Sequence, residues 1–321
     1  MSEPEPTPKK RFPTVRISEI SEENRPRWLI EKLWGNSGCG GICGLPKSMK
    51  SWLGLDMAIS VASGTACIGT FPVIDQGRVL IYLAEDSPPM VKDRVSSIAR
   101  HRGLPISGLD LHAISTPRLR LDSSDDCLRL LETVDQLRPR LLLLDPLVRL
   151  HSANENSAQE ISVLLSYLRD LQRSFQMAVV VIHHARKSDL PGTRAGQGVR
   201  GSGDLWAFGD TNLYLRHSQG SLVLSVEHRS APTPDPVALR LVADDPQRVH
   251  LEVTSAAVER AKRSSDSLSE SVLEVLRRGP MTKAELRTKI AVNNQRLGAI
   301  LWKLESEGLV IREGRGWRAA S

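Results

Sequence analysis

Continuous apolar runs recur along the middle of the chain and alternate with longer stretches that carry apolar residues at a helical period. Runs without polar interruption are typical of strands that are buried on both faces, as in a parallel sheet. Four segments have this character: 40–43, Val79–Ala84, Leu141–Leu144 and Ala178–Ile182. The stretches 52–62, 88–102, 124–137 and 157–174 predict the helices that connect them. Buried strands separated by helices predict an α/β domain with a parallel sheet.

Further along the chain the apolar runs follow one another without intervening helices. These runs are Asn212–Arg216, Leu222–His228 and Val249–Val253. We expect them to form antiparallel strands that extend one edge of the sheet. Residues 1–26 are rich in Pro, Glu and Lys and lack periodicity, which predicts a disordered leader. The main domain is therefore expected to span residues 27–256.

The last part of the chain has a pattern of its own. Residues 257–267 are charged and rich in serine, as in a linker. Amphipathic stretches predict helices over Leu268–Arg277, Lys283–Ile290 and Gln295–Glu307, and the alternation over 309–319 predicts a β-hairpin. Thr282 and Glu285 have the spacing of a capping box at the start of the second helix. Three helices followed by a hairpin predict a winged helix-turn-helix domain over residues 268–321.

Charge is unevenly distributed along the chain. The net charge is +6, and residues 262–321 carry twelve basic against seven acidic residues, whereas residues 1–26 carry five of each. An anionic partner is therefore expected to meet the last sixty residues. No apolar run approaches the length of about 20 residues that a membrane span needs, and the N-terminus has no signal-peptide core. These features predict a cytoplasmic protein without a membrane partner.

The four cysteines do not form metal-spaced doublets. They are Cys39, Cys43, Cys67 and Cys127. Two of them flank the first predicted strand, where buried thiols are common. We therefore expect buried thiols rather than a zinc site.

The segment that follows the first predicted strand carries the strongest chemical signal. Gly44–Ser51 has the G-x-x-x-x-G-K-[ST] spacing of a phosphate-binding P-loop, with Met49 in place of the second glycine. A strand precedes it and a helix follows it, so backbone N–H groups and the helix N-terminus are placed to bind phosphate. Lys50 is expected to reach the β- and γ-phosphates, and the Ser51 hydroxyl to bind Mg²⁺. The expected nucleotide-binding residues are Gly44, Pro46, Lys47, Ser48, Met49, Lys50, Ser51 and Trp52.

Polar residues follow each of the other three buried strands. Glu85 and Asp86 follow the second strand, Asp145 the third, and His183 and His184 the fourth. In an open parallel sheet, ligands bind outside the carboxyl ends of the strands, beside the P-loop. Each residue alone also suits a turn, a helix cap or a surface position. Their common position after consecutive strands favours a site for ATP and Mg²⁺.

This order of motifs resembles the RecA-like hexameric ATPases, and in particular the RepA-type plasmid helicase group. Gly44–Trp52 is similar to the G-x-P-K-x-x-K-S-W variant of that group, which does not require glycine at the position of Met49. Ala84–Pro88, His183–Lys187 and Val199–Ser202 continue the resemblance in the same order. It covers residues 30–255 and implies a RecA-like domain.

The resemblance also implies roles for individual residues. Glu85 corresponds to the catalytic base, Asp145 to the metal shell and His184 to a phosphate sensor. Arg200 corresponds to a finger that reaches into the site of the neighbouring subunit, where it would stabilise charge on the transferred phosphoryl group. Arg229 is the alternative finger, because RecA-like rings also present basic residues from a late strand.

Two regions are candidates for DNA contact. In RecA-like rings, loops at the places of 149–158 and 186–203 line a channel for single-stranded DNA, although a surface loop without this role is also consistent with the sequence. The second loop supplies Lys187 and Arg194, and neither loop has an aromatic residue for base stacking, so phosphate contacts are expected. In the C-terminal domain the candidates are Asn294 and Arg296 at the start of a helix, with Arg312 and Arg315 on the hairpin. Winged helices also bind proteins, so both partners remain open there.

The sequence therefore predicts an ATPase that assembles with copies of itself into a ring, expected to be a hexamer, and acts as a DNA helicase or translocase. The alternative is an ATPase that does not unwind DNA. Such a protein would serve as a loader, a recombination accessory or an ATP-gated DNA-binding regulator.

Overall fold

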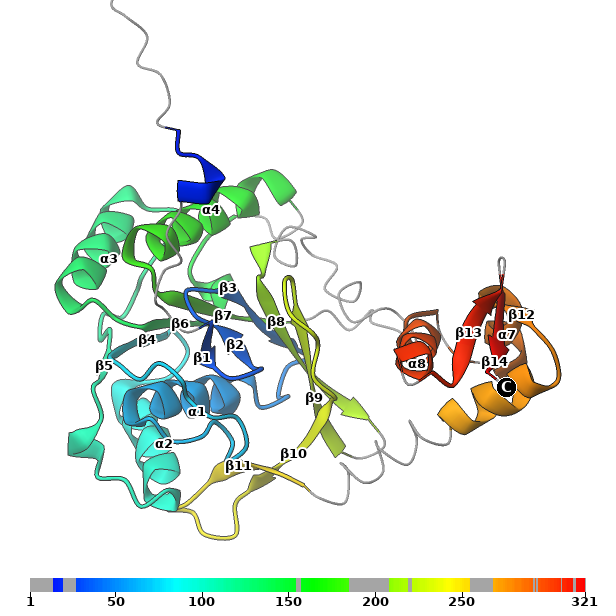
Figure 1. Cartoon of the computed structure of the whole chain (residues 1–321). Coiled ribbons are helices and arrows are strands. Elements are labelled where there is room, and N and C mark those ends of the chain that lie inside the picture. The colour runs from blue at the N-terminus through cyan, green and yellow to red at the C-terminus, as the bar shows by residue number, and fades with distance from the viewer. Residues whose placement is uncertain are drawn as a thin grey trace, which may run out of the picture.

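The computed structural model of the protein describes residues 14–19, 27–153, 157–184, 208–218, 221–254, 268–290, 292, 294–306, 308–313 and 316–320 (Figure 1). The leader predicted over 1–26 includes a short 3-10 helix, Ile17–Glu19, and most of its other residues lie outside the described part. The predicted linker 257–267 also lies outside it.

A nine-stranded sheet in the order β11-β10-β9-β8-β3-β7-β6-β4-β5 organises the larger part of the chain. The six strands from β8 to β5 run parallel to one another. They are β8 (Thr211–Ser218), β3 (Cys39–Gly44), β7 (Ala178–His184), β6 (Leu141–Asp145), β4 (Val79–Leu83) and β5 (Leu111–Ala113). The remaining three, β9 (Ser221–His228), β10 (Val237–Val242) and β11 (His250–Val253), are antiparallel.

The prediction was wrong in one respect at the edge of the parallel part. Asn212–Arg216 was expected to begin the antiparallel extension, yet β8 runs parallel to β3 and antiparallel only to β9. A parallel neighbour needs a long crossover, and the residues between His184 and Thr211 are numerous enough to supply one. The antiparallel extension therefore begins one strand later than predicted. Strands β5 and β10 were not predicted, and neither was the small hairpin of β1 (Trp28–Ile30) and β2 (Trp34–Gly35).

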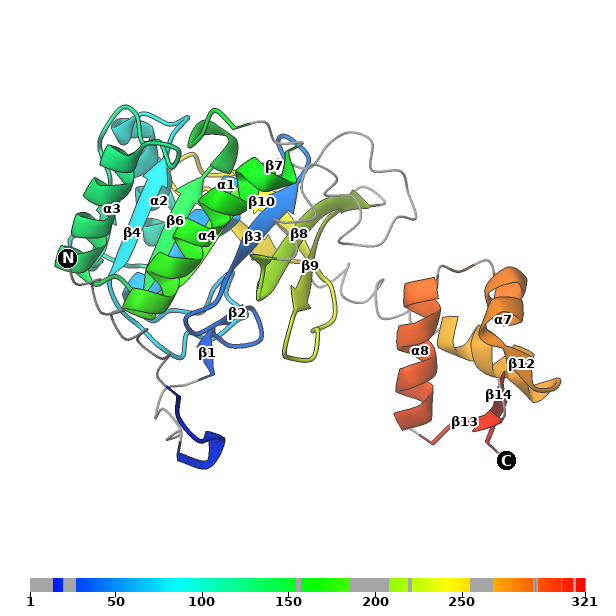
Figure 2. The same cartoon turned by 90° about the horizontal axis from the view of Figure 1, so that it is seen from above.

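Two helices cover each face of the sheet (Figures 1 and 2). Helices α1 (Lys50–Ser63) and α2 (Pro88–His101) lie on one face. Helices α3 (Ser124–Leu137) and α4 (Ala158–Phe175) lie on the other. Successive residues of a strand point to opposite faces, and Leu141 and Leu143 belong to one core whereas Leu142 and Leu144 belong to the other. The continuous apolar runs are thus explained by burial on both sides.

The turn from β3 into α1 has little room and unusual backbone geometry. A Cβ on Gly44 would lie 2.5 Å from Ser48 Oγ and 2.6 Å from the carbonyl oxygen of Leu215, so only glycine fits there. Met49 is the N-cap residue of α1 and has φ 62° and ψ 23°, in the left-handed region that disfavours side chains with a Cβ. Met49 therefore adopts the conformation that a glycine would adopt with less strain. Its side chain packs partly buried against the core around α1, which offsets this strain.

The C-terminal unit comprises three helices and a three-stranded sheet. A helix spans residues 268–277. It is followed by β12 (Met281–Thr282), α7 (Lys283–Ile290), α8 (Asn294–Ser306), β13 (Val310–Glu313) and β14 (Gly316–Ala319), with the sheet order β12-β14-β13. The capping box forms as predicted, because the Thr282 N–H donates to Glu285 Oε2 at 2.8 Å and the Glu285 N–H donates to Thr282 Oγ1 at 3.3 Å. Strand β12 was not predicted, since two residues are too few to show a period.

The geometry of Met49 leads to a stability prediction. Met49→Gly removes a left-handed strain of about 1 kcal/mol. It also adds a similar cost in backbone entropy and loses the partly buried packing of the Met49 side chain. We therefore expect the free energy of unfolding to change by less than about 1 kcal/mol, measured by chemical denaturation.

Met57→Gly is the matched control. Met57 is fully buried within the same helix, so its loss should cost more than about 3 kcal/mol through the cavity and the helical glycine. An equal loss of stability in the two variants would contradict the strain assigned to Met49.

Candidate functional site

The register of the sheet brings the four predicted strand ends to one edge. Gly44 at the end of β3 is paired with His184 at the end of β7. On the far side of β7, Asp145 at the end of β6 is paired with Leu83, two residues before Glu85. Because the strands are parallel, all four carboxyl ends face the same edge, where the P-loop begins.

Lys50 lies at the centre of this edge with its side chain almost completely buried. Its ammonium donates to the carbonyl oxygens of Gly44 at 3.0 Å and of Leu45 at 2.7 Å. Burial lowers the pKa of Lys50 to about 8, and the nearby Asp145 carboxyl opposes part of that shift. The loop therefore holds a desolvated cation whose charge an anion would stabilise.

Asp145 is the second buried charge of the site. Burial raises the pKa of its carboxyl to about 6, while a hydrogen bond from the Ser51 side chain acts in the opposite direction. The negative charges of Asp86 and Glu85 raise the pKa further, and Lys50 lowers it. The Ser51 hydroxyl and the Asp145 carboxylate thus form a pair of oxygen ligands beside the phosphate loop, which suits Mg²⁺.

The two acidic residues after β4 have different surroundings. Asp86 is 12 % exposed and accepts a hydrogen bond from Arg94 Nη1 at 2.5 Å. Glu85 is 48 % exposed and accepts one from Arg149 Nε at 2.7 Å. An exposed ion pair contributes about 1 kcal/mol or less and opens readily. Glu85 is therefore the more available of the two carboxylates.

Arg94 also connects α2 to the first turn of α1. Its guanidinium carbon lies 5.8 Å from the centre of the Trp52 ring, in the range of a cation–π contact. Trp52 directly follows Ser51, so Arg94 links the P-loop helix to the loop that carries Glu85. Sequence patterns do not identify Arg94 or Arg149 as these partners, because packing of the folded chain decides which carboxylate a long arginine side chain reaches.

The two histidines lie where the sequence placed them. His183 is buried at the end of β7 beside Cys43, and His184 is partly buried beside Gly44.

Burial raises the thiol pKa of both Cys39 and Cys43 to about 12, so these thiols stay protonated. Among the described residues, no three His, Cys, Asp or Glu side chains gather as a ready metal site. A divalent ion here would need ligands from the nucleotide as well, as Mg²⁺ commonly does.

Four of the predicted contact residues lie outside the described part of the chain: Arg200, Lys187, Arg194 and Arg315. The backbone of Asn294 and Arg296 forms the first turn of α8, and the Arg312 guanidinium lies 5.3 Å from the Trp317 ring centre.

Arg229, the alternative finger, lies at the opposite end of β8 from the P-loop. It follows His228, which pairs with Thr211 at the start of β8. Its guanidinium is 3.8 Å from Asp210, and its side chain is 67 % exposed. Arg229 is therefore remote from the P-loop of its own chain.

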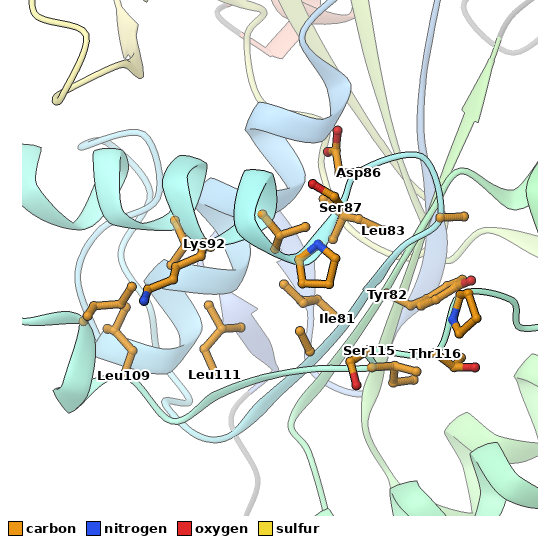
Figure 3. Close-up of a pocket in the computed structure, with 18 residues that line it drawn as sticks. Ile81, Tyr82, Leu83, Asp86, Ser87, Lys92, Leu109, Leu111, Ser115 and Thr116 are labelled. Atoms are coloured by element: carbon orange, nitrogen blue, oxygen red, sulfur yellow. The ribbon is translucent and has the colours of Figure 1, made fainter.

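A cavity of about 450 Å³ lies between α2, β4 and β5 (Figure 3). Its walls are apolar, and Asp86 and Ser87 form part of its rim. No residue of the P-loop contributes to its lining, so it is separate from the phosphate site.

In the described part of the chain, no helix is both long and apolar enough to span a bilayer.

The raised pKa of Asp145 predicts a pH-dependent effect on stability. A carboxyl with a pKa near 6 in the folded state and about 3.9 in the unfolded state disfavours folding increasingly as pH rises from 4 to 6. Asp145→Asn removes this penalty. We expect the variant to gain about 2 kcal/mol on the parent between pH 4 and 7 without nucleotide, measured by denaturation at each pH.

Asp135→Asn is the control, because Asp135 is 58 % exposed on α3 and its loss removes the same charge at the surface. The difference in free energy of unfolding between Asp145→Asn and Asp135→Asn should grow as pH rises. Parallel stability profiles for Asp145→Asn and the parent would contradict the burial cost.

Comparison with known proteins places this geometry in a family. A family profile described as an AAA domain matches residues 5–189. No curated protein matches the chain in sequence.

Two solved structures are similar in fold. The ATPase domain of G40P has a TM-score of 0.50 and 14 % identity, covering 67 % of this chain and 84 % of that one. A DnaB-like replicative helicase has a TM-score of 0.51 and 14 % identity, covering 67 % of this chain and 57 % of that one. At this identity the likeness establishes the fold, which is the RecA-like fold predicted from the motifs. Because the AAA-domain profile matches more than half of the chain, the protein belongs to this family, with a P-loop ATPase domain of RecA-like fold.

Proposed function

We propose that the protein is an ATP-hydrolysing, DNA-associated ring motor, and more specifically a DNA helicase or translocase of the RepA type. The observation that carries the proposal is the convergence of Lys50, Ser51, Asp145 and Glu85 at one edge of the sheet. Charge couples Lys50, Asp145 and Glu85, and a hydrogen bond joins the Ser51 side chain to Asp145. Such an arrangement suits binding and hydrolysis of a nucleoside triphosphate with Mg²⁺.

The P-loop residues bind and orient the phosphates in this proposal. Backbone N–H groups of the loop donate to phosphate oxygens, and Gly44 allows their close approach. Lys50 moves its ammonium from the loop carbonyls to the phosphates, which restores the pKa that burial lowers. Ser51 and Asp145 hold Mg²⁺, which supplies charge neutralisation at the phosphates when bound.

Glu85 serves as the general base that accepts a proton from the attacking water. Its ion pair with Arg149 is exposed and weak, so Glu85 can turn toward the phosphates at little cost. Asp86 is less suitable because Arg94 holds it in a partly buried ion pair. His184 is placed beside Gly44 and would respond to the γ-phosphate by hydrogen bonding.

A neighbouring subunit completes the site in a homo-oligomeric ring, which we propose to be a hexamer. Arg200 is the preferred finger, with Arg229 as its rival. The position of Arg229 at the amino end of β8 is consistent with action only on another subunit's site.

DNA is the proposed partner of both domains, which we assign to 27–256 and 268–321, joined by the linker 257–267. In the channel, Lys187 and Arg194 would contact the phosphates of single-stranded DNA. We propose that the C-terminal unit is a winged helix whose residues Asn294, Arg296, Arg312 and Arg315 meet DNA. The excess of basic residues in this part of the chain and the RecA-like fold shared with a replicative helicase support a nucleic-acid partner.

ATP turnover with and without single-stranded DNA tests the proposed function, beside a strand-displacement assay. A helicase or translocase should show turnover that rises with DNA. Stimulation without strand displacement would favour a loader or recombination accessory. Turnover that ignores DNA would exclude the DNA motor.

The assignment of the base predicts different outcomes for two adjacent substitutions. Glu85→Gln should lower the kcat of phosphate release by about 100-fold or more, because water loses its proton acceptor. It should leave nucleotide affinity nearly unchanged, because the side chain keeps its size and its hydrogen bond acceptor.

Asp86→Asn is the matched control one residue away. It should reduce kcat much less, because Asp86 is already engaged by Arg94. A larger loss in Asp86→Asn than in Glu85→Gln would reverse the assignment.

A further inference from the structure

An exposed tryptophan stands on the outer face of α8. Trp302 is 71 % exposed, although it lies in a helix whose opposite face forms the core of the C-terminal unit. Leu297, Leu301 and Leu304 are buried on that opposite face. Trp302 is thus left out of the core by its helical position, since it falls on a different side of the helix from these leucines.

A cation lies one helical turn from this tryptophan. Gly298 precedes Trp302 by four residues and shares its face of α8. A Cβ on Gly298 would lie 2.8 Å from Lys283 Nζ, so the ammonium rests directly against the bare backbone of α8. Arg287 follows Lys283 by one turn of α7 and is exposed. Lys283 therefore lies beside the face that carries Trp302, and Arg287 is a second exposed cation one turn further along α7.

Acidic residues do not neutralise these two cations. Among the described residues, Lys283 and Arg287 form no ion pair, whereas Arg278 and Arg318 are paired with Glu274 and Glu313. Glu285, the one acidic residue of α7, accepts hydrogen bonds from Thr282 at the helix start. The face thus combines an aromatic ring with positive charge.

This combination fits a nucleic acid better than a protein. A protein interface needs about 800 Å² on each partner, with an apolar centre. Trp302 instead has exposed charged residues of both signs nearby, Lys283 on α7 and Glu305 three residues further along α8, in a region with twelve basic and seven acidic residues. An aromatic ring beside unpaired cations is the usual arrangement for stacking a base and binding its phosphate.

We propose that Trp302, Gly298 and Lys283 form a binding platform for an unpaired base of single-stranded DNA. The indole stacks on the base, the absence of a side chain at Gly298 lets the Lys283 ammonium lie against α8 one turn from the indole, and Lys283 contacts the adjoining phosphate. Duplex DNA keeps both faces of each base covered by its neighbours, so the platform selects single strands. The proposal rests on the proposed function in taking DNA as the partner.

Binding of fluorescein-labelled oligonucleotides to the full-length protein, followed by anisotropy, tests the platform. Trp302→Ala should weaken binding of a dT oligonucleotide about tenfold and leave binding of a matched duplex within about twofold. Trp302→Phe should retain most of the affinity because it keeps an aromatic face. Lys283→Gln should reduce the slope of log K against log salt by about 0.7, whereas Trp302→Ala should leave that slope unchanged.

Val163→Ala is the control, because Val163 is an exposed apolar residue, 66 % exposed on α4, and α4 is not part of the proposed platform. Equal affinity of Trp302→Ala and the parent for the dT oligonucleotide would overturn the proposal. So would an equal loss for duplex, or a change confined to self-association measured by light scattering. If Trp302→Ala binds the dT oligonucleotide as tightly as the parent and DNA still stimulates ATP turnover of the parent, the proposed platform is contradicted. The proposed function as a DNA motor is then unaffected. A parent without DNA-stimulated turnover would instead contradict the proposed function.

Discussion

Two buried charges of opposite sign at one edge of the sheet govern the structure of the site. Burial lowers the pKa of Lys50 to about 8 and raises that of Asp145 to about 6, so each group is pushed toward its neutral form. Their mutual attraction and the Ser51 hydrogen bond recover only part of this cost. An anionic phosphate beside Lys50 and a cation beside Asp145 would stabilise the charged forms of both side chains at the same time. The protein thus retains local instability that a metal-bound nucleotide is suited to remove.

The fold was largely predictable because the apolar pattern records burial on both faces of the strands. Leu141–Leu144 and Ala178–Ile182 each supply alternate residues to two cores, and no other common architecture requires such continuous runs. The same runs are followed by Asp145 and His183, and these polar residues mark the edge of the sheet where the site lies. Strand β8 was misassigned in direction because its parallel partner β3 is remote in sequence. Strand direction depends on the crossover, and local residue preferences do not encode it.

The partners of the acidic residues could not be predicted from the sequence. Asp86 and Glu85 are adjacent, yet Arg94 of α2 holds one and Arg149 after β6 holds the other. Long side chains reach any of several neighbours, so the choice is made by tertiary packing. The left-handed backbone of Met49 was equally hidden, although its place in the motif pointed to a position where glycine is usual. The ion pairs with Arg94 and Arg149 leave Glu85 more exposed than Asp86.

If both domains bind DNA, they use different interactions: ionic contacts to phosphates in one and base stacking in the other. The channel loops 149–158 and 186–203 carry no aromatic residue, so they would hold the strand through phosphate charges and release it easily during movement. Trp302 would hold a base by stacking, which depends little on salt and retains the strand when ionic contacts are broken. A motor that steps along DNA needs both kinds of contact, because a purely ionic grip is lost as salt rises. In the proposed ring motor, charge-based contacts of the loops and an aromatic contact at Trp302 would therefore serve complementary roles.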